Sequence, residues 1–210
     1  MVMVTAAPTG PVAFPAARAD LCLAYANTLY WRGREPQTET LHTLDDVVNW
    51  SVTEAGLDAD FVEAFRAGWA TRPSKTKAAF DEAIVLRETI YRIFAAMASG
   101  AAPAPADLAR FNRALAQAPA RAQLRRIGDG YAWEVDKLRR TVPALLAPVL
   151  WSAGDLLVRP ERRRVRLCAN EKCLWLFLDD SKSGTRRWCA MSACGNRAKA
   201  RRHYLRRKQG

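Results

Sequence analysis

Four of the five cysteines of this 210-residue chain lie near its C-terminal end, in two pairs of identical spacing. Cys168 and Cys173 form the first pair, and Cys189 and Cys194 form the second, with fifteen residues between the pairs. Two close pairs, each on a tight turn, can be brought face to face around one tetrahedral ion. The spacing therefore predicts one structural zinc ion (Zn2+) held by four thiolates.

Two disulfides, or a set of unliganded buried thiols, are the competing explanations for the same four residues. The first residues contain no positively charged region and no long apolar stretch, so we expect no signal peptide. We therefore expect a cytoplasmic, nucleoid-associated protein, and disulfides are disfavoured in the cytoplasm. Four thiolates leave no open position on the metal for water, which makes a catalytic metal improbable.

Short apolar runs surround the first cysteine pair, and a helix is expected to follow the second pair. Residues 165–167 and 174–178 suit a small hairpin that carries the first metal-binding turn. Ser192 is a good N-cap, which would place Cys194 in the first turn of a helix that ends near Lys208.

The net charge of +12 lies entirely in the last quarter of the chain. Residues 159–210 contain 16 Lys and Arg against four acidic residues, whereas residues 1–158 contain 17 charges of each sign. Such asymmetry is typical of a polyanion-binding module attached to a neutral body, although a solvated charged face is the alternative. The expected nucleic-acid contacts are Arg186, Arg187, Arg197, Lys199, Arg201, Arg202, Arg206 and Arg207.

The preceding residues predict an α+β protein: a mainly helical body over 19–158 with one β-hairpin, then a small zinc finger over 159–210 that ends in a basic helix. Residues 1–18 are expected to be a disordered leader, and 32–40 a polar loop. Gly128-Asp129-Gly130 marks the hairpin turn. No run of about 18 apolar residues exists that could cross a membrane. Helices are expected at 20–31, from Thr43 to Gly56, and at 61–69, 74–98, 107–117 and 143–157, the last interrupted by Pro148.

Arg87 is a cation on the apolar stripe of the predicted 74–98 helix. A buried arginine needs an acidic partner such as Asp45, Asp46 or a neighbour of Glu88, or a pocket that holds an anion. Buried hydrogen bonding is the alternative to ligand binding for the whole candidate group. The candidate ligand-binding residues are Asn27, Trp31, Arg87 and Asn112.

These motifs resemble a known family. The segment WCAMSACGNRAKARRHYLRR, preceded by the first cysteine pair, resembles the CGNR zinc finger. The segments LCLAYANT, LHTLDDVVNW, VLRETI and DLARFNRAL are similar to landmarks of the ABATE domain, so the resemblance spans about residues 19 to 208. Cys22 stands where the family usually has an aspartate. The resemblance implies a stress-induced transcription regulator with a DNA-binding finger and an N-terminal domain that senses a small-molecule effector.

No set of residues typical of an enzyme is present. His42 and His203 are isolated, and the chain has no P-loop, HExxH or GxGxxG motif, so we expect no enzyme. Cationic surface does not distinguish DNA from RNA, so an RNA-binding or ribosome-associated protein is the alternative. A homodimer is plausible because DNA regulators often bind two half-sites.

Overall fold

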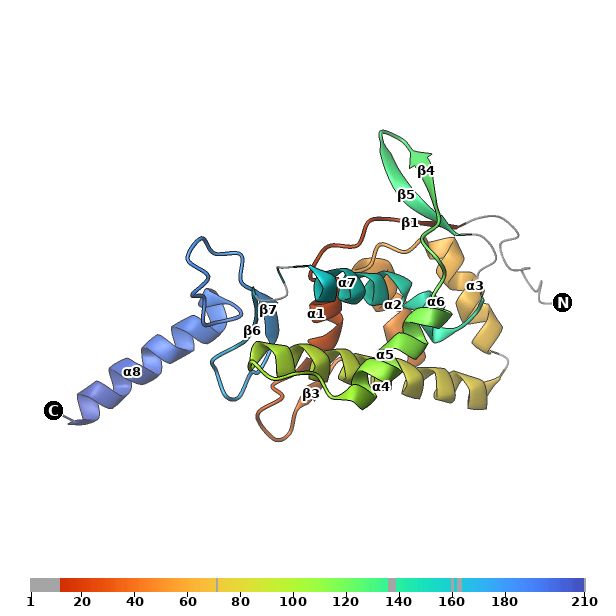
Figure 1. Ribbon diagram of the computed structural model, residues 1–210. Helices are drawn as coiled ribbons and strands as arrows, with labels where there is room; N and C mark the ends of the chain where they lie inside the picture. Colours follow the sequence, from red (N-terminus) through yellow and green to blue (C-terminus); the bar gives the residue numbers. More distant parts are fainter. Residues whose placement is uncertain (1–11, 71, 136–138, 160, 162–163, 210) are drawn as a thin grey trace.

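Helices build most of the molecule, and small sheets accompany them (Figure 1). The computed structural model describes the chain apart from residues 1–11, 71, 136–138, 160, 162–163 and 210. The helices are α1 (Leu21–Ala26), α2 (Leu44–Thr53), α3 (Ala59–Ala70), α4 (Pro73–Ala98), α5 (Pro105–Gln117), α6 (Val142–Leu145), α7 (Ala147–Val158) and α8 (Asn196–Gln209). The expected α+β class is confirmed.

The described strands form three small antiparallel sheets. One has the order β1-β5-β4, one pairs β2 with β3, and one pairs β6 with β7. The strands are β1 (Val12–Phe14), β2 (Leu29–Tyr30), β3 (Thr38–Glu39), β4 (Gln123–Ile127), β5 (Gly130–Val135), β6 (Val165–Leu167) and β7 (Leu176–Leu178). The predicted hairpin at Gly128 is therefore confirmed as β4–β5, but it is not the one β-element of the body.

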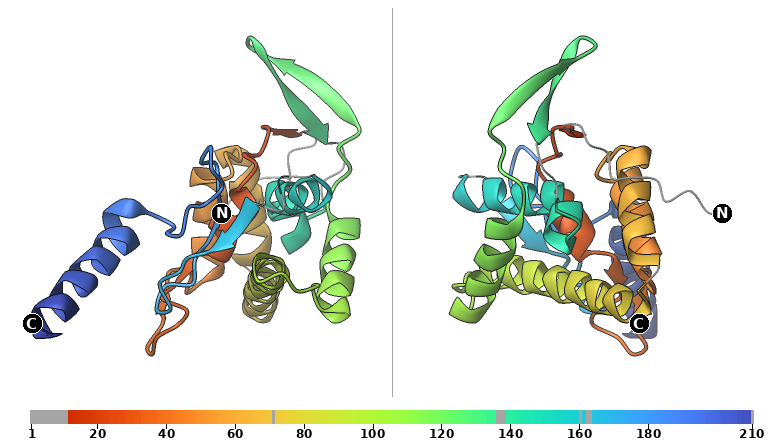
Figure 2. Two further views of the ribbon diagram at one scale, coloured as in Figure 1. Left: turned by 60° about the vertical axis from the view of Figure 1, so that its left-hand side comes forward. Right: turned by 90° about the vertical axis from the view of Figure 1, so that its right-hand side faces the viewer.

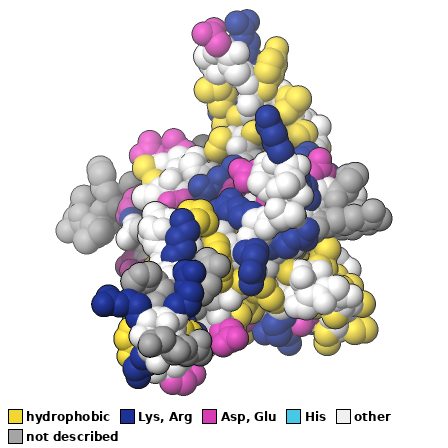
Figure 3. Space-filling model, turned by 90° about the vertical axis from the view of Figure 1, so that its left-hand side faces the viewer, with side chains coloured by type: hydrophobic (Ala, Val, Ile, Leu, Met, Phe, Trp, Pro, Cys, Tyr) yellow, Lys and Arg dark blue, Asp and Glu magenta, His cyan; other side chains and the backbone are white. Residues whose placement is uncertain are grey.

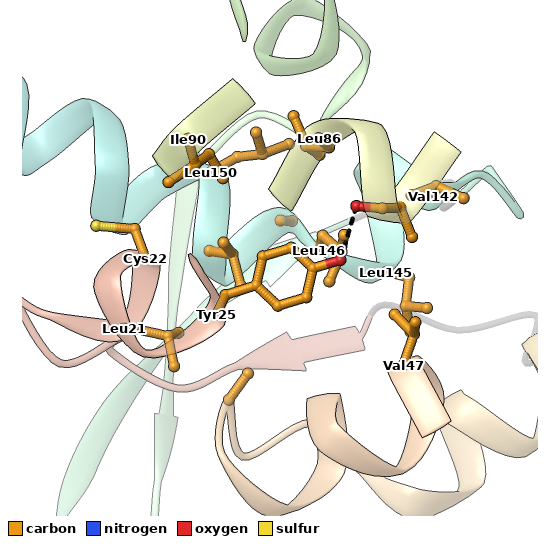
Figure 4. Close-up of a cluster of buried hydrophobic side chains, with 14 of the residues drawn as sticks. Leu21, Cys22, Tyr25, Val47, Leu86, Ile90, Val142, Leu145, Leu146 and Leu150 are labelled. Atoms are coloured by element: carbon orange, nitrogen blue, oxygen red, sulfur yellow. Dashed lines mark hydrogen bonds between the residues drawn. The ribbon is translucent and has the colours of Figure 1, made fainter. Parts of the chain in front are cut away.

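The core lies where α1 and α4 meet α6 and α7 (Figure 4). Tyr25 of α1 is fully buried there, and its hydroxyl donates to the carbonyl oxygen of Ala83 in α4 at 2.9 Å. Leu86 and Ile90 of α4 face the same cluster, and Ile90 belongs to the apolar stripe that the helical spacing predicts. The long central helix thus provides one wall of the core.

Local signals set two helix boundaries. Thr43 forms the predicted capping box, because its hydroxyl accepts from the backbone N–H of Asp46, and the Asp46 carboxylate accepts from the N–H of Thr43. The expected interruption at Pro148 is also found, since α6 ends at Leu145 and α7 begins at Ala147.

The expectation of a disordered leader is wrong for the described residues 12–18. Val12–Phe14 forms β1, which pairs with β5 in the register Phe14↔Trp133. The Phe14 side chain is fully buried and packs edge to face on Trp151. A strand of three residues leaves no detectable period in the sequence, and pairing with a distant hairpin stabilises it.

The predicted helix 20–31 is too long, and the predicted polar loop 32–40 contains a strand. Helix α1 ends at Ala26, and Leu29–Tyr30 turns away to pair with Thr38–Glu39 as β2–β3. The apolar spacing of Leu21, Tyr25 and Leu29 mimics a longer helix. Asn27, the C-cap residue of α1, makes tertiary contacts that are described below.

The β6–β7 hairpin, which begins the predicted finger, packs into the body. Val165 and Leu176 are buried in the same core cluster as α1, α4 and α7. Beyond the hairpin, α8 projects away from the rest of the molecule (Figures 1 and 2). The finger is therefore anchored to the body by its hairpin, while α8 extends away from the body.

Candidate metal centre and cationic helix

The four predicted zinc ligands come together at one point. Their sulfur atoms all lie within 4.8 Å of one another, with Cys173 and Cys189 3.7 Å apart and Cys189 and Cys194 3.8 Å apart. A tetrahedral ion with Zn–S bonds of about 2.3 Å separates its sulfur ligands by about 3.8 Å. All four are free thiols. The donor set and its spacing therefore fit one structural zinc ion, which would hold the two turns together.

Each cysteine pair sits on its own turn. In the first turn, the backbone N–H of Cys168 donates to Trp175 at 2.8 Å, and that of Cys173 donates to Asn170 at 2.7 Å. The Asn170 side chain donates to the sulfur of Cys194 at 3.4 Å and links the first turn to the second pair. An amide donor beside a thiolate stabilises its negative charge.

The second pair does not have the predicted cap. Cys194 lies in a π-helical turn, Met191–Gly195, whose N-cap is Ala190 rather than Ser192, and α8 follows directly. A Cβ atom on Gly195 would lie 2.6 Å from the sulfur of Met191, so a larger residue here would push that flexible side chain aside. Gly195 is the glycine of the CGNR motif.

Cys168, Cys173 and Cys189 cannot all ionise at this distance without a cation. Hydrogen bonding from Cys173 lowers the pKa of Cys168 to about 2, whereas the contact with Cys168 raises the pKa of Cys173 to about 12. Contact with Cys168 also raises the pKa of Cys189. A divalent ion removes this conflict because it stabilises all four thiolates together.

Three indole rings shield the cysteines from water. Trp175 and Trp188 come from the finger, and Trp31 comes from the loop after β2 in the body. The backbone of Trp31 has φ +57°, a left-handed conformation that is uncommon for a bulky residue. The body therefore supplies part of the surroundings of the metal centre.

Arg186 is committed to contacts inside the finger. Its guanidinium donates to the carbonyl oxygens of Trp188 and Cys189 and to Asp180, and it lies over the ring of Phe177. The geometry gives Arg186 the role of bracing the second cysteine pair.

The other predicted nucleic-acid contacts lie outside the metal centre. The side chain of Arg202 lies outside the described residues. Arg187 is exposed and stacks on Trp188, while Arg197 is exposed and lies 4.5 Å from the ring centroid of Trp31. The remaining exposed members of the predicted set, all on α8, are Lys199, Arg201, Arg206 and Arg207.

Two family models match the chain in the order that the motifs predict. The CGNR zinc finger model matches residues 164–207. The ABATE model, described as "Putative stress-induced transcription regulator", matches residues 19–160, more than half of the chain. The chain belongs to the ABATE family. No curated protein matches it. Both matched families are regulator and zinc-finger types rather than enzymes, and no described helix is long and apolar enough to span a membrane.

The ABATE body does not bring the four candidate ligand-binding residues into one pocket. Asn27 pairs with the backbone of Leu176 in β7: its amide donates at 2.8 Å and its oxygen accepts at 3.0 Å. Trp31 packs on the metal centre, and Asn112 is exposed on α5. Asn27 and Trp31 thus join the ABATE body to its finger.

Arg87 forms the buried ion pair that was the alternative to an anion pocket. Its side chain is 2% exposed, and its two terminal nitrogens donate to the carboxylate of Glu39 at 2.6 and 2.7 Å. Its Nε donates to Glu88 at 2.8 Å. The expected partners Asp45 and Asp46 are wrong, because Asp45 pairs with Arg66 and Asp46 caps α2. All three Arg87 nitrogens are engaged, so the geometry gives no support to anion sensing there.

Several residues that hold this arrangement are not expected from the sequence. Arg32 donates to both oxygens of Glu88 and stacks 3.7 Å from the ring centroid of Tyr91. The Tyr91 hydroxyl in turn donates to the carbonyl oxygen of Leu174 in the first zinc-binding turn. No local signal marks these residues, because each partner lies more than fifty positions away in the sequence.

Proposed function

We propose that this ABATE-family protein is a transcription regulator that binds DNA through α8, with the zinc centre fixing α8 to the body. The observation that carries the proposal is a 14-residue helix that projects from the molecule and exposes cations along its length. Lys and Arg side chains gather on the face of the molecule from which α8 projects (Figure 3).

The cations of α8 lack acidic partners within the described part of the chain. None of Arg197, Lys199, Arg201, Arg206, Arg207 and Lys208 has a carboxylate within 4.0 Å among the described residues. Several arginines of the body, by contrast, pair with carboxylates, as in Arg92–Asp107 and Arg121–Asp155. Tyr204 and Leu205 are 57% and 45% exposed, so no described element covers the helix. A polyanion would supply the missing negative charge.

The zinc ion supplies no catalytic chemistry in this proposal. Four protein sulfurs fill a tetrahedral shell and leave no position for water or substrate. The finger residues instead fix the direction of α8. Cys194 and Gly195 end the turn that leads directly into α8, and contacts of Asn27 and Tyr91 hold the first zinc-binding turn on the body. A rigid base under α8 reduces the entropy lost when the helix binds DNA.

The test titrates the full-length, zinc-loaded protein into fluorescent duplex DNA and into matched RNA at several salt concentrations. If about five cations contact phosphates, the logarithm of the binding constant should fall with the logarithm of salt with a slope near −4 to −5. Arg206→Gln with Arg207→Gln should flatten that slope by about 2. Lys75→Gln with Arg113→Gln, which removes the same charge from exposed sites on α4 and α5, is the matched control and should leave it unchanged.

Absence of binding to both nucleic acids at low salt would refute the proposal. Strong preference for RNA would replace DNA with an RNA-binding function, because the same cations bind either backbone. Two chains per duplex in sedimentation would support the expected homodimer, whose two α8 helices would bind two half-sites.

For the sensing role, we propose that a small effector binds between body and finger rather than at Arg87. A cavity of about 540 Å³ there is lined by residues of α1, α2 and β7, including Ala24, Trp50 and Leu178. An occupant would contact both parts and so alter how the finger is held. Thermal-shift screening of amino acids, nucleotides and organic acids tests this, since a stabilising compound should lose its effect in Ala24→Phe, which fills the cavity. Equal stabilisation of Ala24→Phe by every hit would overturn it.

A further inference from the structure

A second cavity lies beside the metal centre, between the body and the start of α8. Its volume is about 420 Å³, which is within the range of small-ligand sites. We call it the junction cavity. Its lining comes from the loop after β2, the first zinc-binding turn, Trp188 and the first two turns of α8: Trp31, Arg34, Ala169, Asn170, Glu171, Lys172, Trp188, Cys194, Arg197, Ala198 and Arg201.

Positive charge dominates this lining. The lining contains four cationic side chains and one carboxylate, that of Glu171. The cations are Arg34, Lys172, Arg197 and Arg201. None of the four has a carboxylate within 4.0 Å among the described residues; Arg34 donates to the carbonyl oxygen of Pro36 and lies over Trp31. Arg197 and Arg201 are four residues apart and so share one face of α8. The cavity therefore continues the cationic surface of α8 onto the body.

The fold holds the body loop tightly against the finger at this point. The N–H of Gly33 donates to the carbonyl oxygen of Lys172 at 3.3 Å, and a Cβ atom at Gly33 would lie 1.7 Å from the carbonyl oxygen of Glu171. Only glycine allows this approach. It places Arg34 of the body beside Lys172 of the finger, so two cations far apart in the sequence line one cavity.

We propose that the junction cavity binds a phosphate group and the sugar attached to it. Arg34, Lys172 and Arg201 provide charge for the phosphate, and the half-buried indoles of Trp31 and Trp188 provide apolar surface for the sugar. Where the phosphate belongs to DNA, this inference rests on the proposed function and adds two contacts outside α8. A free nucleotide offers the same chemistry.

The test compares three full-length, zinc-loaded proteins: wild type, Arg34→Gln with Lys172→Gln, and the Lys75→Gln with Arg113→Gln control. Zinc content and melting temperature establish first that all three are folded. In one arm, each protein is titrated into duplex DNA across a salt series. In the second arm, AMP is added at millimolar concentration without DNA, and the melting temperature is recorded.

We expect the Arg34 and Lys172 variant to flatten the DNA salt slope by about 2, with no change in the control. If AMP raises the melting temperature of wild type and control but not of that variant, the cavity takes free nucleotides. A variant that matches wild type in both arms overturns the inference. Failure of wild type to bind DNA instead refutes the proposed function, and the AMP arm still decides whether the cavity binds phosphate.

Discussion

Cys189 connects the two halves of the metal centre, because its sulfur contacts Cys173 of the first pair and Cys194 of its own. We expect one zinc ion per wild-type chain and its loss in Cys189→Ser, since a hydroxyl is a poor zinc ligand. Structural zinc contributes about 10–16 kcal/mol to small fingers. Elemental analysis measures the zinc content of both proteins, and thiol titration measures how many cysteines are free of metal.

Cys22→Ala is the matched control for this change. Cys22 is fully buried in the core, and burial raises the pKa of its thiol to about 12, as expected for an inert apolar residue. The control should therefore keep its zinc. Wild-type protein without metal, and with four freely titratable thiols in the finger, would contradict the assignment.

Asn27 matters through its side-chain amide, which satisfies both the N–H and the carbonyl oxygen of Leu176. Asn27→Ala leaves two buried backbone groups without partners, which we expect to lower the free energy of unfolding by about 2–4 kcal/mol. Urea denaturation provides the measurement. Asn112→Ala, at an exposed site on α5, should change it by less than about 0.5 kcal/mol. Equal stability of the two variants would show that Asn27 does not hold the finger on the body.

At the scale of elements, a chain of charges ties β3 to α4 and to the loop after β2. Glu39 of β3 pairs with Arg87 of α4, Arg87 contacts Glu88, and Glu88 pairs with Arg32. Burial alone would raise the pKa of the Glu39 carboxyl, but the hydrogen bonds and charge of Arg87 outweigh it and lower that pKa. The same balance, with Arg32 as the main partner, lowers the pKa of Glu88.

This network predicts how stability depends on pH. A carboxyl with a lowered pKa in the folded state stabilises the protein above its unfolded pKa of about 4.3, and this stabilisation is lost as pH falls through the folded value. Glu39→Gln should lower the free energy of unfolding by about 2–3 kcal/mol at pH 7. This is less than the loss expected on breaking a fully buried ion pair, because Glu88 still contacts Arg87. The stability of this variant should also fall less steeply than that of wild type below about pH 4. Urea denaturation midpoints of wild type and Glu39→Gln, measured from pH 3 to 7, test both the loss at pH 7 and the weaker pH dependence. If the two proteins showed the same dependence on pH, the network would be contradicted.

At the scale of the whole molecule, the zinc finger and the ABATE body share a core. Val165 of β6 and Leu176 of β7 are each 1% exposed within the cluster formed by the body helices. Residues 19–158 contain enough apolar side chains to form a core of their own. The structure instead makes the zinc-bearing hairpin one wall of that core.

We therefore expect chelation of zinc to destabilise the whole chain. Far-ultraviolet circular dichroism should show one thermal transition, lowered by about 20 °C or more, since zinc contributes at least about 10 kcal/mol and 1 kcal/mol corresponds to about 2–4 °C for a protein of this size. Two transitions, of which the larger is insensitive to the chelator, would show that the body folds independently. The Arg206→Gln with Arg207→Gln variant, which leaves the metal centre intact, should melt as wild type does.

The sequence by itself determined the features that depend on neighbouring residues. The spacing of the cysteines specified the zinc ligands, Thr43 and Asp46 specified the start of α2, and the charge asymmetry marked the finger. Each rests on contacts within a few residues or on composition, so a linear pattern is sufficient. The glycine pair at the β4–β5 turn belongs to the same class.

Only the tertiary structure decided where distant segments meet. Pairing with β5 gives residues 12–14 their strand, and pairing of Asn27 with Leu176 accompanies the early end of α1. Glu39, rather than Asp45 or Asp46, neutralises Arg87. The side-chain contacts among these join residues separated by 48 to 149 positions. Strand β1 has only three residues, too few to show the alternation of apolar and polar side chains that identifies a strand in a sequence. Their energy depends on burial and on geometry in three dimensions, and neither is encoded in local spacing.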